Sequence, residues 1–188
     1  MQLRHQFLFA AATVILFALW LQAAPRQSVV KYTAEGQLKL PENYREWVFL
    51  SSGLGMTYGP AAQGETHPMF DNVFVNPEGY RAFLKTGKWP DKTIFVLEIR
   101  GAETNASINK GGHTQGDVRA IEVEVKDASA KTGTWTFYGP DGKAFPTSAS
   151  CYQCHEKNTA VENTFVQFYP TLMPVAQKMG TLKPGFSR

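Results

Sequence analysis

The stretch Cys151-Tyr152-Gln153-Cys154-His155 decides how this chain is interpreted. It is a C-x-x-C-H run, and it contains both cysteines of the 188-residue sequence. This pattern is the attachment signature of c-type haem, in which each thiol forms a thioether with one haem vinyl group. The spacer of two residues brings both sulfurs within reach of the two vinyl groups, and the histidine that follows can ligate the iron. We therefore predict one covalently attached haem c, held by Cys151 and Cys154, with His155 as the iron ligand.

Three other uses of the two cysteines remain open. A redox dithiol normally follows a strand in a βαβ unit. This motif instead follows a stretch rich in glycine and proline at residues 139–146, which predicts that it lies in a loop. A zinc site would need two further ligands, for which His67 and His113 are the candidates. A structural disulfide is the third alternative, because the chain has the features of an exported protein.

The N-terminal segment has the layout of a secretory signal peptide. Arg4 and His5 form a basic head, residues 7–21 are apolar and uncharged, and small residues precede Pro25. The apolar run is short for a membrane-spanning helix, which needs about 20 residues. We predict a signal peptide at residues 1–24, with an uncleaved anchor as the alternative, a lead-in segment at 25–40 and a haem domain at 41–188. The folded part is then expected in the periplasm.

Composition and charge narrow the class of protein. The formal net charge is only +3, which is too balanced for the basic stripe of a nucleic-acid-binding protein. The length and the 43% hydrophobic content fit one globular domain with a real core. The 13 Phe, 7 Tyr and 4 Trp predict an aromatic interior.

Local signals predict a few helices. Asn76, Pro77 and Glu78 are typical of a helix start, and Gly87 is typical of a helix end, so a helix is expected over residues 76–86. Pro41 favours one helical turn over residues 41–46. The apolar residues 164–179 are interrupted by two prolines and predict short helical pieces.

Alternating and β-branched runs predict strands in the rest of the chain. In one strand, Phe95 and Leu97 share a face with Ile99, and in another Glu122 and Glu124 share a face opposite to their apolar neighbours. A polar, glycine-rich loop is expected between these two strands, at residues 101–116, and another at 53–67. The predicted strands are 47–51, 71–75, 93–100, 118–125 and 133–138. The fold class is therefore α+β, predominantly antiparallel β-sheet with a few short helices.

Several stretches, taken in order, resemble the cytochrome P-460 family, including its gas-binding branch called cytochrome c′-beta. They are NYREWV at 43–48, NVFVNP at 72–77, TGKWPDKT at 86–93, EVEVKD at 122–127, CYQCH at 151–155 and FVQFYP at 165–170. The resemblance implies a homodimeric β-sheet protein with one c-type haem. It also implies that His155 is the proximal ligand and that sheet residues cover the distal side.

The resemblance also separates two activities. P-460 members that oxidise hydroxylamine have a lysine, bonded to the porphyrin edge, immediately before a glutamate of the central strand. This chain has Leu97 before Glu98, and leucine cannot form that bond. Nearby lysines that remain as alternatives are Lys85, Lys88 and Lys92. A distal carboxylate that moves protons aligns with Glu122, whose alternative role is a solvent-facing strand residue. Asp71 aligns with a distal arginine of some members.

These residues lead to a prediction of the pocket and of the function. We expect Phe95 and Leu97, with Phe70 or Phe74, to surround an open distal side of five-coordinate iron. Residues that could supply a sixth ligand instead are His67, His113, Met56, Met69 and Met173. The predicted function is binding of NO or a similar small gas, for sensing, carrying or scavenging. The alternatives are a P-460-type enzyme that oxidises hydroxylamine or NO, and a periplasmic electron carrier with a redox partner protein.

Overall fold

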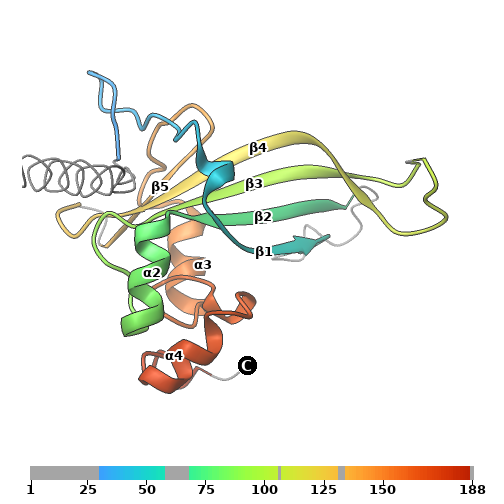
Figure 1. Cartoon of the computed structure of the whole chain (residues 1–188). Coiled ribbons are helices and arrows are strands. Elements are labelled where there is room, and N and C mark those ends of the chain that lie inside the picture. Colours follow the sequence, from blue (N-terminus) through green and yellow to red (C-terminus); the bar gives the residue numbers. More distant parts are fainter. Residues whose placement is uncertain (1–29, 58–67, 106, 131–133, 187–188) are drawn as a thin grey trace, which may run out of the picture.

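The computed structural model describes residues 30–57, 68–105, 107–130 and 134–186. Its centre is an antiparallel sheet of five strands that lie in chain order (Figure 1). The strands are β1 (Val48–Leu54), β2 (Met69–Val75), β3 (Ile94–Glu103), β4 (Thr114–Lys126) and β5 (Trp135–Tyr138). The described part also has helices α2 (Pro77–Thr86), α3 (Ser150–Asn158) and α4 (Met173–Met179), and 3-10 turns η2 (Tyr44–Glu46) and η4 (Val166–Phe168). The predicted α+β class is therefore confirmed.

The predicted signal peptide at 1–24 lies outside the described residues, as does the start of the lead-in segment at 25–40. Within the described ranges, no helix has the length and apolarity needed to cross a membrane.

Helix α2 follows its sequence signals. Pro77 occupies the first turn, and Gly87 ends the helix in the left-handed conformation, at φ 68°, with its N–H donating to the Phe83 carbonyl. The side chain of Asn76 does not cap the helix. Its Oδ1 instead accepts a hydrogen bond of 2.9 Å from the backbone N–H of Ile94, which ties the start of the helix to β3.

The predicted loop at 101–116 is too long, because both flanking strands continue into it. Ala102 pairs with Gln115 and Glu103 pairs with Thr114, so β3 and β4 form a hairpin that extends beyond the helices (Figure 1). This end of the hairpin is polar and largely exposed, so it has no apolar alternation that would reveal a strand. Backbone pairing with the neighbouring strand, rather than burial, determines its structure.

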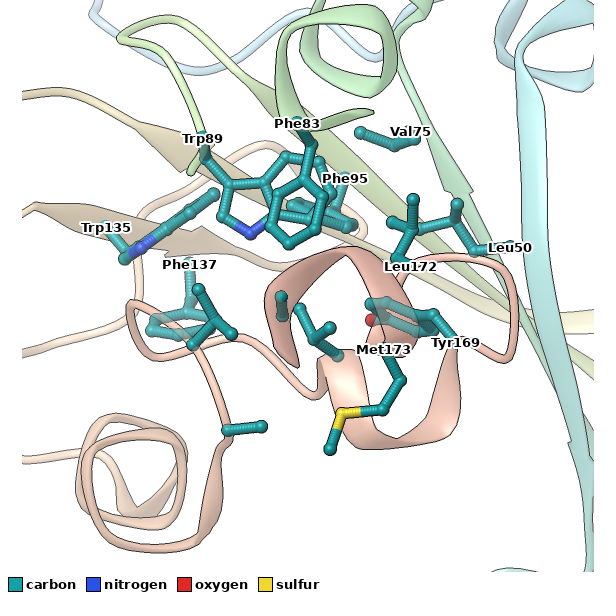
Figure 2. Close-up of a cluster of buried hydrophobic side chains, with 14 residues drawn as sticks. Leu50, Val75, Phe83, Trp89, Phe95, Trp135, Phe137, Tyr169, Leu172 and Met173 are labelled. Carbon is teal, nitrogen blue, oxygen red and sulfur yellow. The ribbon is translucent and has the colours of Figure 1, made fainter. Parts of the chain in front are cut away.

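The sheet separates two clusters of buried side chains. The helix-side cluster lies between the sheet and the helices (Figure 2), and its largest members are Leu50, Val75, Phe83, Trp89, Phe95, Trp135, Phe137, Tyr169, Leu172 and Met173. The back-face cluster lies on the other side of the sheet and consists of Leu38, Tyr44, Trp47, Ile94, Val96, Val123, Val125 and Tyr138. Phe95 of β3 belongs to the helix-side cluster, and its neighbours Ile94 and Val96 belong to the back-face cluster, which is the alternation that the sequence predicts.

Candidate functional site

The C-x-x-C-H motif lies on helix α3 and not in a loop, which corrects the prediction from its flanking residues. The glycines and prolines at 139–146 belong to the connection that precedes the helix, and α3 begins only after Ala149. Cys151 and Tyr152 pack against the helix-side cluster, so the helix lies against the interior of the protein. Both thiols are free, so the disulfide alternative is not what the structure contains. In the described part of the chain, no group of three or more His, Cys, Asp and Glu is arranged to hold a metal ion.

The His155 side chain is fixed by a hydrogen bond at Nδ1 and by packing of its ring against two phenylalanines. Nδ1 lies 2.9 Å from the carbonyl oxygen of Asn163, which requires that Nδ1 carries the hydrogen and donates it. The ring packs edge-on between Phe137 and Phe165, with centroid distances of 4.6 and 4.7 Å. The bond to the Asn163 carbonyl occupies Nδ1, and the other ring nitrogen, Nε2, lies 3.6 Å from the Glu124 carboxylate. Nε2 is therefore the nitrogen that is available to a metal.

A cavity lies between α3 and the sheet, and His155 and Cys151 line it. Its other lining residues are Val73, Phe95, Leu97, Glu122, Val123, Glu124, Phe137 and Tyr169. Five of the predicted site residues are thus brought together from three separate parts of the chain: Phe95, Leu97, Glu122, Cys151 and His155. The wall contributed by the sheet is apolar except for its two carboxyl groups.

Glu122 and Glu124 both face this cavity, so the alternative of a solvent-facing Glu122 does not hold. Desolvation by burial raises the pKa of each carboxyl group, and the nearby His155 partly offsets that rise. The wall predicted from Phe95, Leu97 and Glu122 thus contains a second carboxyl group. Glu124 was missed as a site residue, although its separation of two positions from Glu122 places both on one face of β4.

The structure does not bring Phe70 and Phe74 to the cavity. Residues directly opposite in an antiparallel pair lie on the same face, and Phe74 pairs with Val96 of the back-face cluster. The Phe74 ring packs against Tyr44 and Phe49, each at a centroid distance of 5.7 Å. Phe70 pairs with Arg100 on the same side of the sheet. On β2 it is Val73 that faces the cavity.

None of the alternative lysines and sixth ligands among the described residues lines the cavity. Lys92 is half-exposed and bonds Asp127 at 2.7 Å, and Lys85 and Lys88 are exposed. Met173 is buried in the helix-side cluster, and His113 is exposed beside the β3–β4 hairpin. Met56, Met69 and Asp71 are also absent from the lining. His67 lies outside the described residues.

The residues that are present fit a haem. Two free thiols lie three positions apart on one helix, and the histidine after them has Nδ1 bonded and Nε2 available. Cys151 and His155 line a cavity whose sheet wall is apolar apart from two carboxyl groups. These features define the class of the protein as a c-type haem protein.

Comparison with known families agrees with this class. The model of the family described as Cytochrome P460 matches residues 41–166, which is more than half of the chain. The chain therefore belongs to the cytochrome P460 family, and the resemblance found in the sequence is confirmed. A search of the curated proteins finds no match to this chain.

Proposed function

We propose that this protein carries one haem c, attached through Cys151 and Cys154 and ligated by His155, and that it binds NO or a similar small, uncharged gas. The observation that carries this proposal is the composition of the cavity wall opposite His155. Phe95 and Leu97 lie there, and no Met, Lys or second His of the described residues does. The described residues of this wall therefore include none of the Met, Lys or His side chains that would supply a strong nitrogen or sulfur ligand at the remaining position on the iron.

The helix supports covalent attachment. Residues three apart in an α-helix lie on neighbouring faces, so Cys151 and Cys154 can reach the same porphyrin edge. His155 follows directly, and the bond from Nδ1 to the Asn163 carbonyl keeps its ring in one orientation. When bound, the haem supplies an iron atom with one open coordination position.

The cavity favours uncharged ligands over anions. Phe95 and Leu97 provide no hydrogen-bond donor that would compensate for the desolvation of a charged ligand. Glu122 and Glu124 add negative charge whenever they ionise, and that charge repels an anion such as azide or nitrite. A neutral diatomic molecule meets neither penalty, which is why we favour NO or CO.

We do not propose hydroxylamine oxidation, because the cavity wall has no amine among its described residues. The branch of the family with that activity needs an amine at the porphyrin edge, and Leu97 offers none. We further propose, from the pattern of residues 1–24, that the protein is exported to the periplasm, and from the family resemblance that it is a homodimer.

The test is made on the exported protein. Its mass should exceed that of the bare polypeptide by one haem, and its ferrous spectrum should be that of a five-coordinate, high-spin c-type haem. NO and CO should bind, whereas azide should bind weakly. His155→Ala should keep the covalent haem and lose the proximal ligand, and Cys151→Ser with Cys154→Ser should lose attachment. The bare polypeptide mass, or the sharp α and β bands of a low-spin six-coordinate haem, would refute the proposal.

A further inference from the structure

A strained turn supplies the carbonyl group that orients His155. Val161 and Thr164 form an isolated antiparallel bridge, and Glu162 and Asn163 between them have φ values of 44° and 62°. Both central residues are thus in the left-handed region, as in a type I′ turn. Such turns favour Asn-Gly, and glutamate in particular adopts this conformation at a cost. Surrounding contacts must therefore hold the turn in place.

Three elements that are distant in sequence provide those contacts. From the loop before β3, the backbone N–H of Trp89 donates to the Glu162 carboxylate at 2.8 Å. From the end of β4, Lys126 Nζ donates to the same carboxylate at 3.1 Å, and the Lys126 side chain is only 11% exposed. From β5, the indole N–H of Trp135 donates to the Glu162 carbonyl at 2.7 Å. The side chain of Glu162 is thereby held by two hydrogen bonds, and its backbone carbonyl by a third.

Thr164 adds two hydrogen bonds to these contacts. Its Oγ1 accepts a bond of 2.9 Å from the indole N–H of Trp89 and donates one of 2.7 Å to the Val161 carbonyl. Thr164 and Val161 are almost fully buried. The turn is thus a rigid part of the core, and the Asn163 carbonyl that it presents to His155 Nδ1 has little freedom to move.

We propose that the Glu162–Asn163 turn is a positioning device that sets how strongly His155 donates electrons to the haem iron. The inference rests on the proposed function, because it needs His155 as proximal ligand. A hydrogen bond from Nδ1 raises the basicity of a ligating imidazole. Stronger donation favours the ferric over the ferrous state, so loss of the bond should raise the midpoint potential. The hydrogen bond from His155 Nδ1 goes to the backbone carbonyl of Asn163 and not to its side-chain amide.

Two substitutions at the same residue test the role of the backbone. Asn163→Gly keeps access to positive φ, so the carbonyl should stay in place and the potential should stay at the wild-type value. Asn163→Val removes the same side-chain amide, but a β-branched residue resists positive φ and should displace the carbonyl. We expect a shift of about tenfold in the ferric–ferrous equilibrium, which is about +59 mV for one electron. The iron–histidine stretching frequency of the ferrous protein should fall with it.

A second pair of variants tests the contacts that hold the turn without replacing a residue of the turn itself. Lys126→Met removes a contact to Glu162 and should shift the potential in the same direction, by less than Asn163→Val does. Lys92→Met is the matched control, because Lys92 bonds Asp127 and not the turn. This pair also serves if Asn163→Val does not fold.

Three results would overturn the inference. They are a wild-type potential in both Asn163→Val and Lys126→Met, equal shifts in Asn163→Val and Asn163→Gly, or equal shifts in Lys126→Met and Lys92→Met. Failure of the proposed function is distinct from all three, because it is visible in the wild-type protein alone, as a missing haem mass or a six-coordinate spectrum.

Discussion

Glu98, which follows Leu97 on β3, anchors the strand that forms the cavity wall, and its replacement by glutamine should destabilise the protein. Its side chain is 3% exposed on the back face of the sheet. The carboxylate accepts hydrogen bonds from the Tyr44 hydroxyl, from Arg45 at 2.5 and 2.8 Å and from Arg100 Nε at 2.5 Å. Burial, together with the bond to Glu98, raises the pKa of Tyr44 to about 12, so its hydroxyl remains a donor at neutral pH.

The size of the loss follows from these partners. A hydrogen bond to a charged group contributes about 1.5–3 kcal/mol, against about 0.5–1.5 kcal/mol for a neutral one. Removing the charge therefore costs about 1 kcal/mol for each well-buried partner. Tyr44 is buried and Arg100 is 24% exposed, so both count in full. Arg45 is 53% exposed, and water screens its pair. We expect Glu98→Gln to lower the free energy of unfolding by about 2–3 kcal/mol, or the melting temperature by about 4–12 °C.

The loss should depend on pH in one direction. Desolvation alone would raise the pKa of Glu98, but the bonds from Arg100, Tyr44 and Arg45 outweigh it, and the pKa lies below its ordinary value. A carboxyl group with a lowered pKa in the folded state stabilises the protein above its unfolded pKa, which is about 4.3, and this contribution is lost as the pH falls through the folded value. The difference between wild type and Glu98→Gln should therefore be full at pH 7 and shrink below about pH 4.

Urea unfolding followed by circular dichroism at pH 7 and at pH 3.5 measures both effects. Glu103→Gln is the matched control, because Glu103 ends the same strand and is exposed. Its cost should be below about 0.5 kcal/mol. A cost for Glu98→Gln as small as that of the control, or one that does not shrink in acid, would show that the cluster does not hold the strand as we describe.

Three further substitutions test the site. Leu97→His should convert the ferrous spectrum to a low-spin six-coordinate form. Phe74→His, on the back face of the sheet, is the control and should leave the spectrum unchanged. An unchanged spectrum in Leu97→His would mean that Leu97 is not above the iron. Glu122→Gln should tighten azide binding about tenfold at pH 8, which is about 1.4 kcal/mol. Its effect on CO binding should be much smaller, because CO carries no charge. Equal changes in azide and CO affinity would contradict the role of the Glu122 charge. Lys183 Nζ donates to the carbonyls of His155 and Glu156, at 3.3 and 2.7 Å, at the end of α3. Lys183→Met should therefore lower the melting temperature by about 2–8 °C, whereas Lys157→Met, exposed on the same helix, serves as control.

Local signals in the sequence predict those parts of the molecule that local physics determines. Pro77 and Gly87 mark the ends of α2, and the alternation of β3 and β4 places Leu97 and Glu122 on one wall. The position of Phe74 could not be predicted in the same way. Its face is fixed by the pairing of β2 with β3, in which Val73 and not Phe74 is opposite Leu97. A shift by one residue reverses every side chain of a strand, and no local pattern in β2 reports that register.

The turn at Glu162–Asn163 was beyond prediction for a different reason. Neither residue favours the left-handed conformation strongly enough to mark a type I′ turn, and the contacts that impose it come from Trp89, Lys126 and Trp135. These three are 27 or more positions away in sequence. The orientation of His155, the proposed proximal ligand, is thus a property of the assembled core, whereas its place in the sequence is a property of the motif.

The alternation of β3 separates the stability of the fold from the chemistry of the site. Glu98 and Val96 hold the strand on the back face, whereas Leu97 between them contributes to the cavity and makes no hydrogen bond through its side chain. A change at position 97 can therefore alter the lining of the cavity without removing a contact that holds the sheet. On the proposed function, this arrangement would let position 97, where the sequence resemblance aligns a lysine in one branch of the family and this chain has leucine, change the chemistry of the site without changing the fold.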